Sequence, residues 1–438
     1  MIERWSRDQV LALAPDASSQ KAAQGVAAPG KWSLRGTTGT VLYGECKGSG
    51  AKPYLACVDL TEPAYRCSCP SRKFPCKHAL GLLLMWSADG VPVQEGAPQW
   101  VTEWVETRAE RAAKSAAKIE AARAQAPDSA SRSEGAKAGA ARVAPAGGES
   151  VRHARVASGL SELERWLADQ VRQGLAGAAE HEWDGLAKRL IDAQAPGVAG
   201  VVSRLSRVRS EESWPGRLLE EYALINLLAV AYRRREELPG SLVETVLIRA
   251  GFPVTREEVL AGPAVRDHWD VLGGRDEEQD RLTARRVWLR GRRTRRAALV
   301  LSFAPPGQPL DASLVTGTTI DADLAFYPGA APLRALVADR RGAVPPEAGP
   351  PGMSPEEGLD EVAGALTGDP WTESWPLVLV GVVPERGSLG GLPLHPRARD
   401  PWRLIAVSGG RPVTVAAEWT PHGLRPLTTW DEEGAVIL

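Results

Sequence analysis

Three cysteines and one histidine lie close together in the first quarter of the chain, and their side chains are those that bind zinc. Cys67, Cys69, Cys76 and His78 follow the spacing Cys-x-Cys-x6-Cys-x-His. Thiolates and imidazoles are preferred zinc ligands, and four protein ligands make a closed tetrahedral site that is structural rather than catalytic. The spacing therefore predicts one structural Zn2+ site.

The gaps between these residues predict the elements that position them. Residues two apart in a strand point to the same side, so a strand near Cys67 and Cys69 can aim both sulfurs at one point. Residues two apart in a helix do not face each other. We therefore expect Cys76 at or before a helix start and His78 in its first turn, an entry that Pro75 suits.

The sequence on either side supplies these elements. Residues 38–45, 53–60 and 64–69 are β-prone segments separated by turns, and the apolar residues 79–86 continue the helix. A small antiparallel sheet followed by a helix, a ββα-type module, would thus carry the four ligands.

The same residues carry a resemblance to a known family. The four ligands match the Cys-x-Cys-xn-Cys-x-His pattern of the SWIM zinc finger, and residues 44–50 and 69–78 resemble bacterial SWIM zinc finger family proteins. The resemblance implies a DNA-binding or protein-interaction module. It also implies partners of the MoxR-type AAA+ ATPase or von Willebrand A (VWA) class, beside which the bacterial relatives occur.

Basic residues surround the ligands. Residues 31–78 contain eight Lys or Arg and three acids, a net charge of +5, and Arg66, Arg72, Lys73 and Lys77 lie within the ligand stretch. They could contact the phosphates of a nucleic acid. Equally, they could stabilise the formal charge of −1 on three thiolates and Zn2+. Both interpretations stay open.

Composition bounds the class of protein. The net charge is −1 over 438 residues, so the whole chain is no nucleic-acid polycation. The first seven residues lack an apolar signal segment, and no stretch approaches the roughly 18 apolar residues of a membrane helix. The chain also has five cysteines, an odd number, and a reducing cytoplasm is the compartment in which thiolates bind metal rather than pair with each other. We therefore expect a cytoplasmic protein without a membrane anchor.

The pattern along the chain predicts an α+β multidomain protein. A zinc finger domain spans residues 1–104. Residues 105–158 form a flexible linker rich in Ala, Gly and Ser, because this span has no Leu, Met, Phe, Tyr or Trp to bury. Residues 159–262 form an α-helical domain, and residues 263–438 a β-rich or α+β domain. We expect the linker to decouple the finger from residues 159–438.

The C-terminal domain is predicted from short apolar segments separated by Pro and Gly turns. The expected strands are residues 287–289, 296–303, 322–327, 375–383, 402–407 and 412–419. Eight arginines lie between residues 281 and 296, just after a block of acids. They could grip phosphate or an acidic partner, but we favour their pairing with these acids in a solvated helix or turn.

The remaining candidates favour ordinary structural roles. His268 between Asp267 and Asp270 is typical of an exposed or hydrogen-bonded residue rather than a catalyst, and Cys46 and Cys57 are typical of buried strand thiols. No nucleotide-binding, metalloprotease or serine hydrolase motif occurs, so we expect no enzyme. The sequence favours an adaptor that binds other proteins, with a DNA-binding protein as the alternative.

Overall fold

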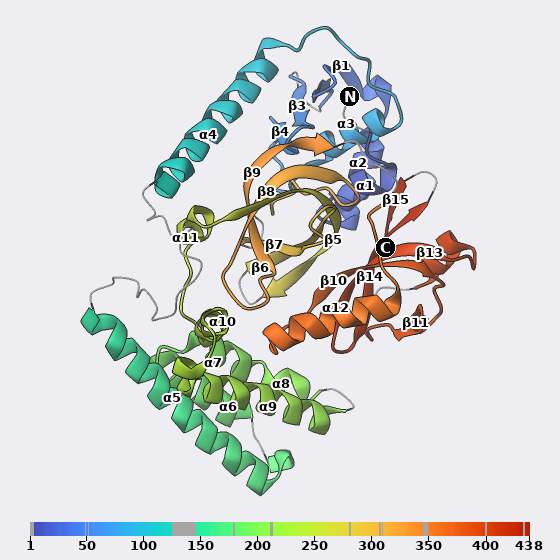
Figure 1. The fold of residues 1–438 in the computed structure, drawn as a ribbon. Helices are drawn as coiled ribbons and strands as arrows, with labels where there is room; N and C mark the ends of the chain where they lie inside the picture. The colour runs from blue at the N-terminus through green and yellow to red at the C-terminus, as the bar shows by residue number, and fades with distance from the viewer. Residues whose placement is uncertain are drawn as a thin grey trace.

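The computed structural model of the chain (Figure 1) describes residues 4–48, 50, 52–124, 146–177, 180–210, 213–279, 282–305, 308, 310–344, 349–398, 401–431 and 434–438. Its sheets lie in the N-terminal and C-terminal regions, with a helical bundle between them. The expected α+β multidomain class is therefore confirmed.

The N-terminal unit packs helices on a four-stranded sheet. Strands β1 (Trp32–Thr37), β2 (Val41–Cys46), β3 (Tyr54–Asp59) and β4 (Ala64–Cys67) pair antiparallel in chain order. Before and after the sheet come α1 (Arg7–Ala12), α2 (Ala17–Val26), η1 (Pro29–Lys31) and α3 (Lys77–Ser87). Nine of the eleven residues of α3 are buried, because α3 contacts α2 on one side and β2, β3 and β4 on another. Gly81 permits this packing, since a Cβ there would lie 2.6 Å from the side chain of Val26.

Two long helices take up the ends of the predicted linker. Helix α4 (Gln99–Ala124) packs Val101 against Tyr43 and Cys57 on the sheet, and α5 (Ala146–Gln173) begins the bundle. Ala, Glu, Lys and Arg are strong helix formers, so a span too polar for a core can still be helical. Residues 125–145 lie outside the described residues, and the flexibility of the linker stays a prediction.

The middle of the chain is a helical bundle, as expected. After α5 it consists of η2 (Leu175–Gly177), α6 (Glu180–Asp192), α7 (Pro196–Ser203), α8 (Leu205–Val208), α9 (Trp214–Arg233), η3 (Arg235–Glu237) and α10 (Gly240–Ala250). Its core includes Trp183, whose Nε1 donates to the hydroxyl of Tyr222 at 3.0 Å. Arg204 joins α7 to α8, as the C-cap of the first and the N-cap of the second.

A closed five-stranded barrel follows the bundle. Its strands are β5 (Ala264–Gln279), β6 (Leu282–Gly291), β7 (Ala297–Ala304), β8 (Thr319–Phe326) and β9 (Arg334–Val344), in the order β5-β6-β7-β9-β8. All pairs are antiparallel except β7 and β9. The short helix α11 (Arg256–Ala261), placed in the predicted α-helical domain, packs Val259 and Leu260 against β8 and β9 of this barrel.

The C-terminal sheet completes the fold. Its order is β10-β13-β14-β15, with β10 (Trp375–Val382), β13 (Val413–Thr420), β14 (Gly423–Asp431) and β15 (Gly434–Ile437), accompanied by α12 (Pro355–Gly368) and the hairpin of β11 (Ser388–Leu389) and β12 (Leu392–Pro393). The predicted strand at residues 402–407 is wrong, because it is helix α13 (Trp402–Ser408). Gly409, with φ of 56°, caps that helix in the left-handed region, a helix-ending signal that outweighs the β-prone residues before it.

The finger and the barrel share a core. The segment between β7 and β8 buries Ala312 and Val315 among the core residues of the N-terminal unit. Tyr65 donates its hydroxyl hydrogen to the carbonyl of Ala312 at 3.2 Å, and Gln9 donates from Nε2 to the carbonyl of Thr316 at 2.9 Å. The linker therefore does not decouple the finger from residues 263–438, contrary to our expectation, because this barrel segment completes the core of the finger.

Candidate metal centre

The sheet and the helix bring the four predicted ligands together. Cys67 is the last residue of β4 and pairs with Ala56 of β3. Ser68 extends this pairing, since its backbone N–H donates to the carbonyl of Leu55 at 3.0 Å and its Oγ accepts from the N–H of Leu55 at 2.9 Å. Cys69 lies just beyond, in a bend. The strand thus ends two residues earlier than predicted, but the backbone before Cys69 is still held by β3.

The second ligand pair lies at the start of α3, as predicted. Cys76 is the N-cap residue in extended conformation, and its carbonyl accepts the first helical hydrogen bond from Leu80 at 3.0 Å. His78 is the second residue of the helix, and both side chains are buried. The imidazole also packs against the ring of Tyr54, with the ring centroids 4.8 Å apart.

The distances fit a tetrahedral zinc ion. The ligand atoms of Cys67, Cys69, Cys76 and His78 all lie within 4.8 Å of one another. Nδ1 of His78 is 3.7 Å from Sγ of Cys67. Zn–S and Zn–N bonds of about 2.3 and 2.0–2.1 Å at a tetrahedral angle place the two atoms roughly 3.6 Å apart. Three sulfurs and one imidazole are also the donor set of structural zinc sites, so the residues fit this ion.

The pKa values of the three ligand thiols are shifted by their hydrogen bonds and by burial. A hydrogen bond from the Cys67 thiol lowers the pKa of Cys76 to about 4, helped by the backbone N–H groups of His78 and Ala79 at the helix start. The same hydrogen bond raises the pKa of Cys67, and burial raises that of Cys69. One thiolate is thus favoured without metal, and a bound Zn2+ stabilises the deprotonated form of all three.

The four basic residues of the ligand stretch all lie at the surface. Arg66, Arg72, Lys73 and Lys77 are exposed. Lys73 pairs with Asp16 at 2.7 Å and also donates to Ser18, and the bond from Lys73 is the main cause of the lowered pKa of Asp16. Within the described part of the chain, the other three make no ion pair.

The remaining candidates have structural roles. Cys46 and Cys57 are buried strand thiols, as predicted, and burial raises the pKa of Cys57 to about 12. Asp267 accepts hydrogen bonds from the backbone of Arg293 and from the backbone and hydroxyl of Thr294, which fixes the turn after β6.

The arginine run lies in strand β6 and the following turn rather than in a helix, and three of its described arginines pair with acids, one of them with an acid of the block before the run. Arg285 pairs with Asp276, Arg290 with Glu361, and Arg292 with Asp270. Arg281 lies outside the described residues.

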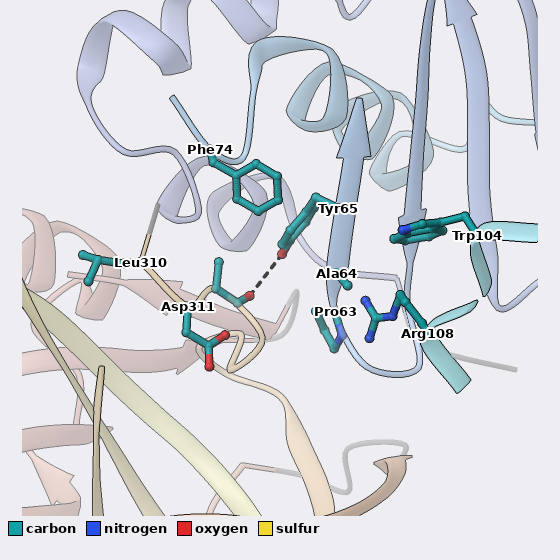
Figure 2. A pocket seen from close by; sticks show the side chains of 9 residues that line it. Pro63, Ala64, Tyr65, Phe74, Trp104, Arg108, Leu310 and Asp311 are labelled. Atoms are coloured by element: carbon teal, nitrogen blue, oxygen red, sulfur yellow. Dashed lines mark hydrogen bonds between the residues drawn. The ribbon is translucent and has the colours of Figure 1, made fainter. Parts of the chain in front are cut away.

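A cavity beside the metal centre was not predicted. Figure 2 shows it between the finger, α4 and the barrel segment, lined by Pro63, Ala64, Tyr65, Phe74, Trp104, Arg108, Leu310, Asp311 and Ala312. Tyr65 and Phe74 each precede a zinc ligand by two residues, so the elements that hold the metal also shape the cavity. No spacing in the sequence relates Tyr65 to Ala312, which are 247 residues apart.

Two segments of the chain match known protein families. Residues 57–87 match the SWIM zinc finger, and residues 151–250 match the SWIM-associated four-helix bundle domain. Searches of curated proteins and of solved structures returned no significant match. Among the described helices, none combines the length and the apolar character needed to cross a bilayer.

The two matches coincide with two parts of the structure. The first covers the end of β3, β4 and α3 with all four ligands, and the second covers the bundle from within α5 to the end of α10. The finger is a zinc-binding module in which the ion is structural. The chain therefore contains a SWIM zinc finger and a SWIM-associated four-helix bundle domain.

Proposed function

We propose that this protein is a zinc-stabilised adaptor that binds other proteins and catalyses no reaction itself. The observation that carries the proposal is the closed ligand set. Protein side chains supply all four ligands, and Cys76 and His78 are buried in the core of the finger. Catalytic zinc sites keep a position open for water or substrate. The metal therefore stabilises the fold of the finger, and the surfaces of that fold are available to bind other proteins.

The proposed partners are an AAA+ ATPase of the MoxR type or a VWA protein, and their basis is the resemblance to the bacterial SWIM proteins. The proposed compartment is the cytoplasm. None of the five cysteines forms a disulfide, and a reducing compartment keeps thiols available for metal.

DNA binding is the second candidate, and the exposed cations beside the metal favour it. Arg66, Arg72 and Lys77 lack ion pairs within the described residues and are available to phosphates. Arg66 and Lys77 are also direct sequence neighbours of ligands, so a role in offsetting the thiolate charge, as expected for a zinc finger of any function, is the competing interpretation.

The barrel supports the adaptor over the DNA-binding candidate. Five-stranded Greek-key barrels of the OB type bind oligonucleotides on the outer face of their second and third strands. Here those strands are β6 and β7, and their outer residues Trp288 and Leu299 are buried against Val378, Ala416 and Leu427 of the C-terminal sheet. The face that such barrels offer to a nucleic acid is therefore covered by the chain itself.

A salt titration separates the two candidates. We would capture partners from native cells and measure the affinity of the purified pair, and of a DNA duplex, between about 50 and 200 mM salt. Phosphate contacts give a slope of about −0.9 per contact in log K against log salt. The adaptor proposal predicts a shallow slope for the protein partner and only weak, non-specific binding of DNA.

A matched pair of variants sharpens this test. The triple change Arg66→Gln, Arg72→Gln and Lys77→Gln removes the unpaired cations beside the metal. The control change Arg155→Gln, Arg165→Gln and Lys188→Gln removes three exposed cations from the bundle. If the first set abolishes a tight DNA complex and flattens its slope by about 3 while the control does not, the adaptor proposal is wrong.

A further inference from the structure

The cavity beside the metal centre has the size and composition of a site for one or two side chains. Its volume is about 300 Å³, at the lower end of the range of about 300–1,000 Å³ for ligand pockets. Aromatic side chains from separate segments line it, Tyr65 from β4, Phe74 from the ligand loop and Trp104 from α4 (Figure 2). Aromatic faces of this kind attract cations.

An unpaired carboxylate stands at the edge of this cavity. The side chain of Asp311 is exposed, and its Oδ1 accepts a hydrogen bond from the backbone N–H of Ser313 at 2.8 Å. No cation pairs with this carboxylate within the described residues; Arg285 donates to the backbone carbonyl of Asp311 instead, at 3.0 Å. The charge of Asp311 is therefore available to a partner.

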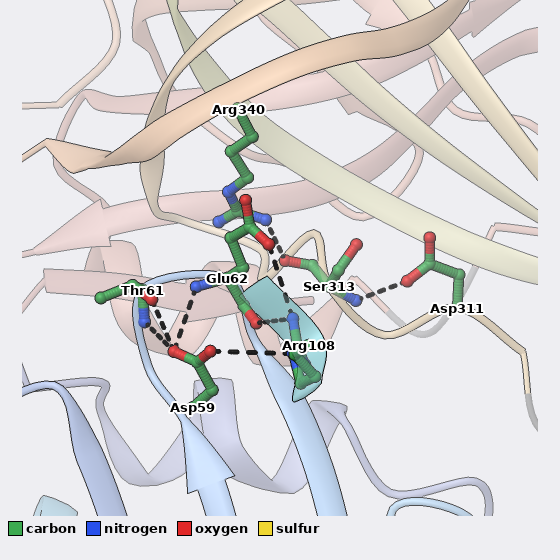
Figure 3. A network of polar contacts seen from close by, with 7 residues as sticks. All are labelled: Asp59, Thr61, Glu62, Arg108, Asp311, Ser313 and Arg340. Atoms are coloured by element: carbon green, nitrogen blue, oxygen red, sulfur yellow. Dashed lines mark hydrogen bonds and ion pairs between the residues drawn. The ribbon is translucent and has the colours of Figure 1, made fainter. Parts of the chain in front are cut away.

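The other charges near the cavity are already paired. Figure 3 shows Arg108 between Asp59 and Glu62, with its Nη2 3.5 Å from Glu62 Oε2 and its Nε 3.9 Å from Asp59 Oδ2. The guanidinium of Arg108 also lies 5.4 Å from the ring centroid of Trp104, so this aromatic wall already contacts one cation.

The net charge of the residues around the cavity indicates whether the cavity would bind a cation or an anion. Arg340 donates to the carbonyl of Ser313, and burial lowers its pKa. Arg285, which donates to the Asp311 carbonyl, is paired with Asp276. Four carboxylates (Asp59, Glu62, Asp276 and Asp311) are thus set against three guanidiniums (Arg108, Arg285 and Arg340), which leaves one negative charge in excess. A phosphate would be repelled by this excess, whereas a basic side chain would be attracted.

We propose that this cavity is the docking site for an arginine side chain, next to an apolar residue, on a partner protein. A guanidinium can pair with the Asp311 carboxylate through two hydrogen bonds while its flat face lies against the aromatic walls. The apolar neighbour would contact Leu310 and Phe74. This inference rests on the proposed adaptor function and names the chemistry of its partner.

A peptide library tests the proposal on the full-length, zinc-loaded chain. Random heptapeptides displayed on phage would be selected against the protein, and a selected peptide would be labelled with fluorescein for anisotropy. The variant Asp311→Asn removes the charge but keeps the oxygen that accepts from Ser313, so the barrel segment keeps its conformation. Asp360→Asn, an exposed position on α12, removes the same charge elsewhere and is the matched control.

The expected result is a set of peptides that share an arginine beside an apolar residue. Asp311→Asn weakens binding about two- to fivefold, the range of an exposed ion pair, and Asp360→Asn leaves it unchanged. Replacing the peptide arginine by citrulline, its neutral isostere, causes a similar loss, and the two changes together cost no more than either alone.

Other outcomes overturn the proposal. Selected peptides without arginine, equal affinity for wild type and Asp311→Asn, or no peptide binding at all would each show that the cavity is not this docking site. The adaptor function fails separately, if the wild-type chain captures no protein partner from native cells. A native partner whose affinity is insensitive to Asp311→Asn leaves the adaptor standing and places its interface elsewhere.

Discussion

Removing zinc should release the barrel segment that completes the core of the finger. Chelation, or the change His78→Ala, removes a ligand set whose metal binding contributes about 10–16 kcal/mol in small zinc domains. That is comparable to the whole stability of a domain, about 5–15 kcal/mol. The finger should therefore unfold, and the segment at residues 310–318 should lose its contacts with it.

The size of the effect follows from those contacts. Burying Val315 contributes about 1.5–3 kcal/mol. The hydrogen bonds from Tyr65 to Ala312 and from Gln9 to Thr316 contribute about 0.5–1.5 kcal/mol each. The total of about 2.5–6 kcal/mol corresponds to amide hydrogen exchange that is about 10²- to 10⁴-fold faster, at a factor of ten for each 1.4 kcal/mol.

Hydrogen exchange measured by mass spectrometry on the intact chain, with and without zinc, checks this expectation. Peptides covering residues 310–318 report the release, and peptides covering residues 151–250 serve as the internal control, because the bundle has its own core. Unchanged protection of residues 310–318 in the metal-free protein would refute the shared core. Equal loss of protection in the bundle would refute its independence.

Two further substitutions test the energetics of the barrel. Glu361→Gln leaves the buried Arg290 guanidinium unpaired and should lower the free energy of unfolding by about 2–3 kcal/mol. This is somewhat less than the ~3–5 kcal/mol for breaking a fully buried pair, because Glu361 is 27% exposed. Urea denaturation measures the effect, and Asp276→Asn is the control, because it breaks the more exposed pair with Arg285 and should lower the free energy of unfolding by under about 1 kcal/mol. Burial raises the pKa of Asp267, but hydrogen bonds from Thr294, Arg293 and His268 outweigh it and hold the pKa below the ordinary 3.8. This carboxylate therefore stabilises the fold above about pH 4 and loses that contribution as the pH falls further. In thermal unfolding, the stability difference between wild type and Asp267→Asn should shrink below about pH 4. A difference that stays constant with pH would contradict the stabilising role of the ionised Asp267 carboxylate.

Two predictions that depend on residues close together in the chain are confirmed by the structure. The position of Cys76 before a helix and of His78 in its first turn follows from the geometry of a two-residue gap, and it is confirmed. The helical character of the middle of the chain also depends on near neighbours only, and it is found in the structure. Helix α13 shows the limit of such reasoning, since the β-prone residues at 402–407 are helical and the helix ends at Gly409 in the left-handed conformation.

The sequence by itself determined the metal, its four ligands and the helical middle of the chain, because each depends on residue types within one or two turns of backbone. Only the tertiary structure decided that the barrel segment enters the finger, that the C-terminal sheet covers β6 and β7, and that Tyr65, Trp104 and Asp311 meet at one cavity. The physical reason is that these contacts join residues far apart in the chain. Burial of apolar surface drives such contacts, but it is non-directional, so no residue spacing specifies which surfaces meet.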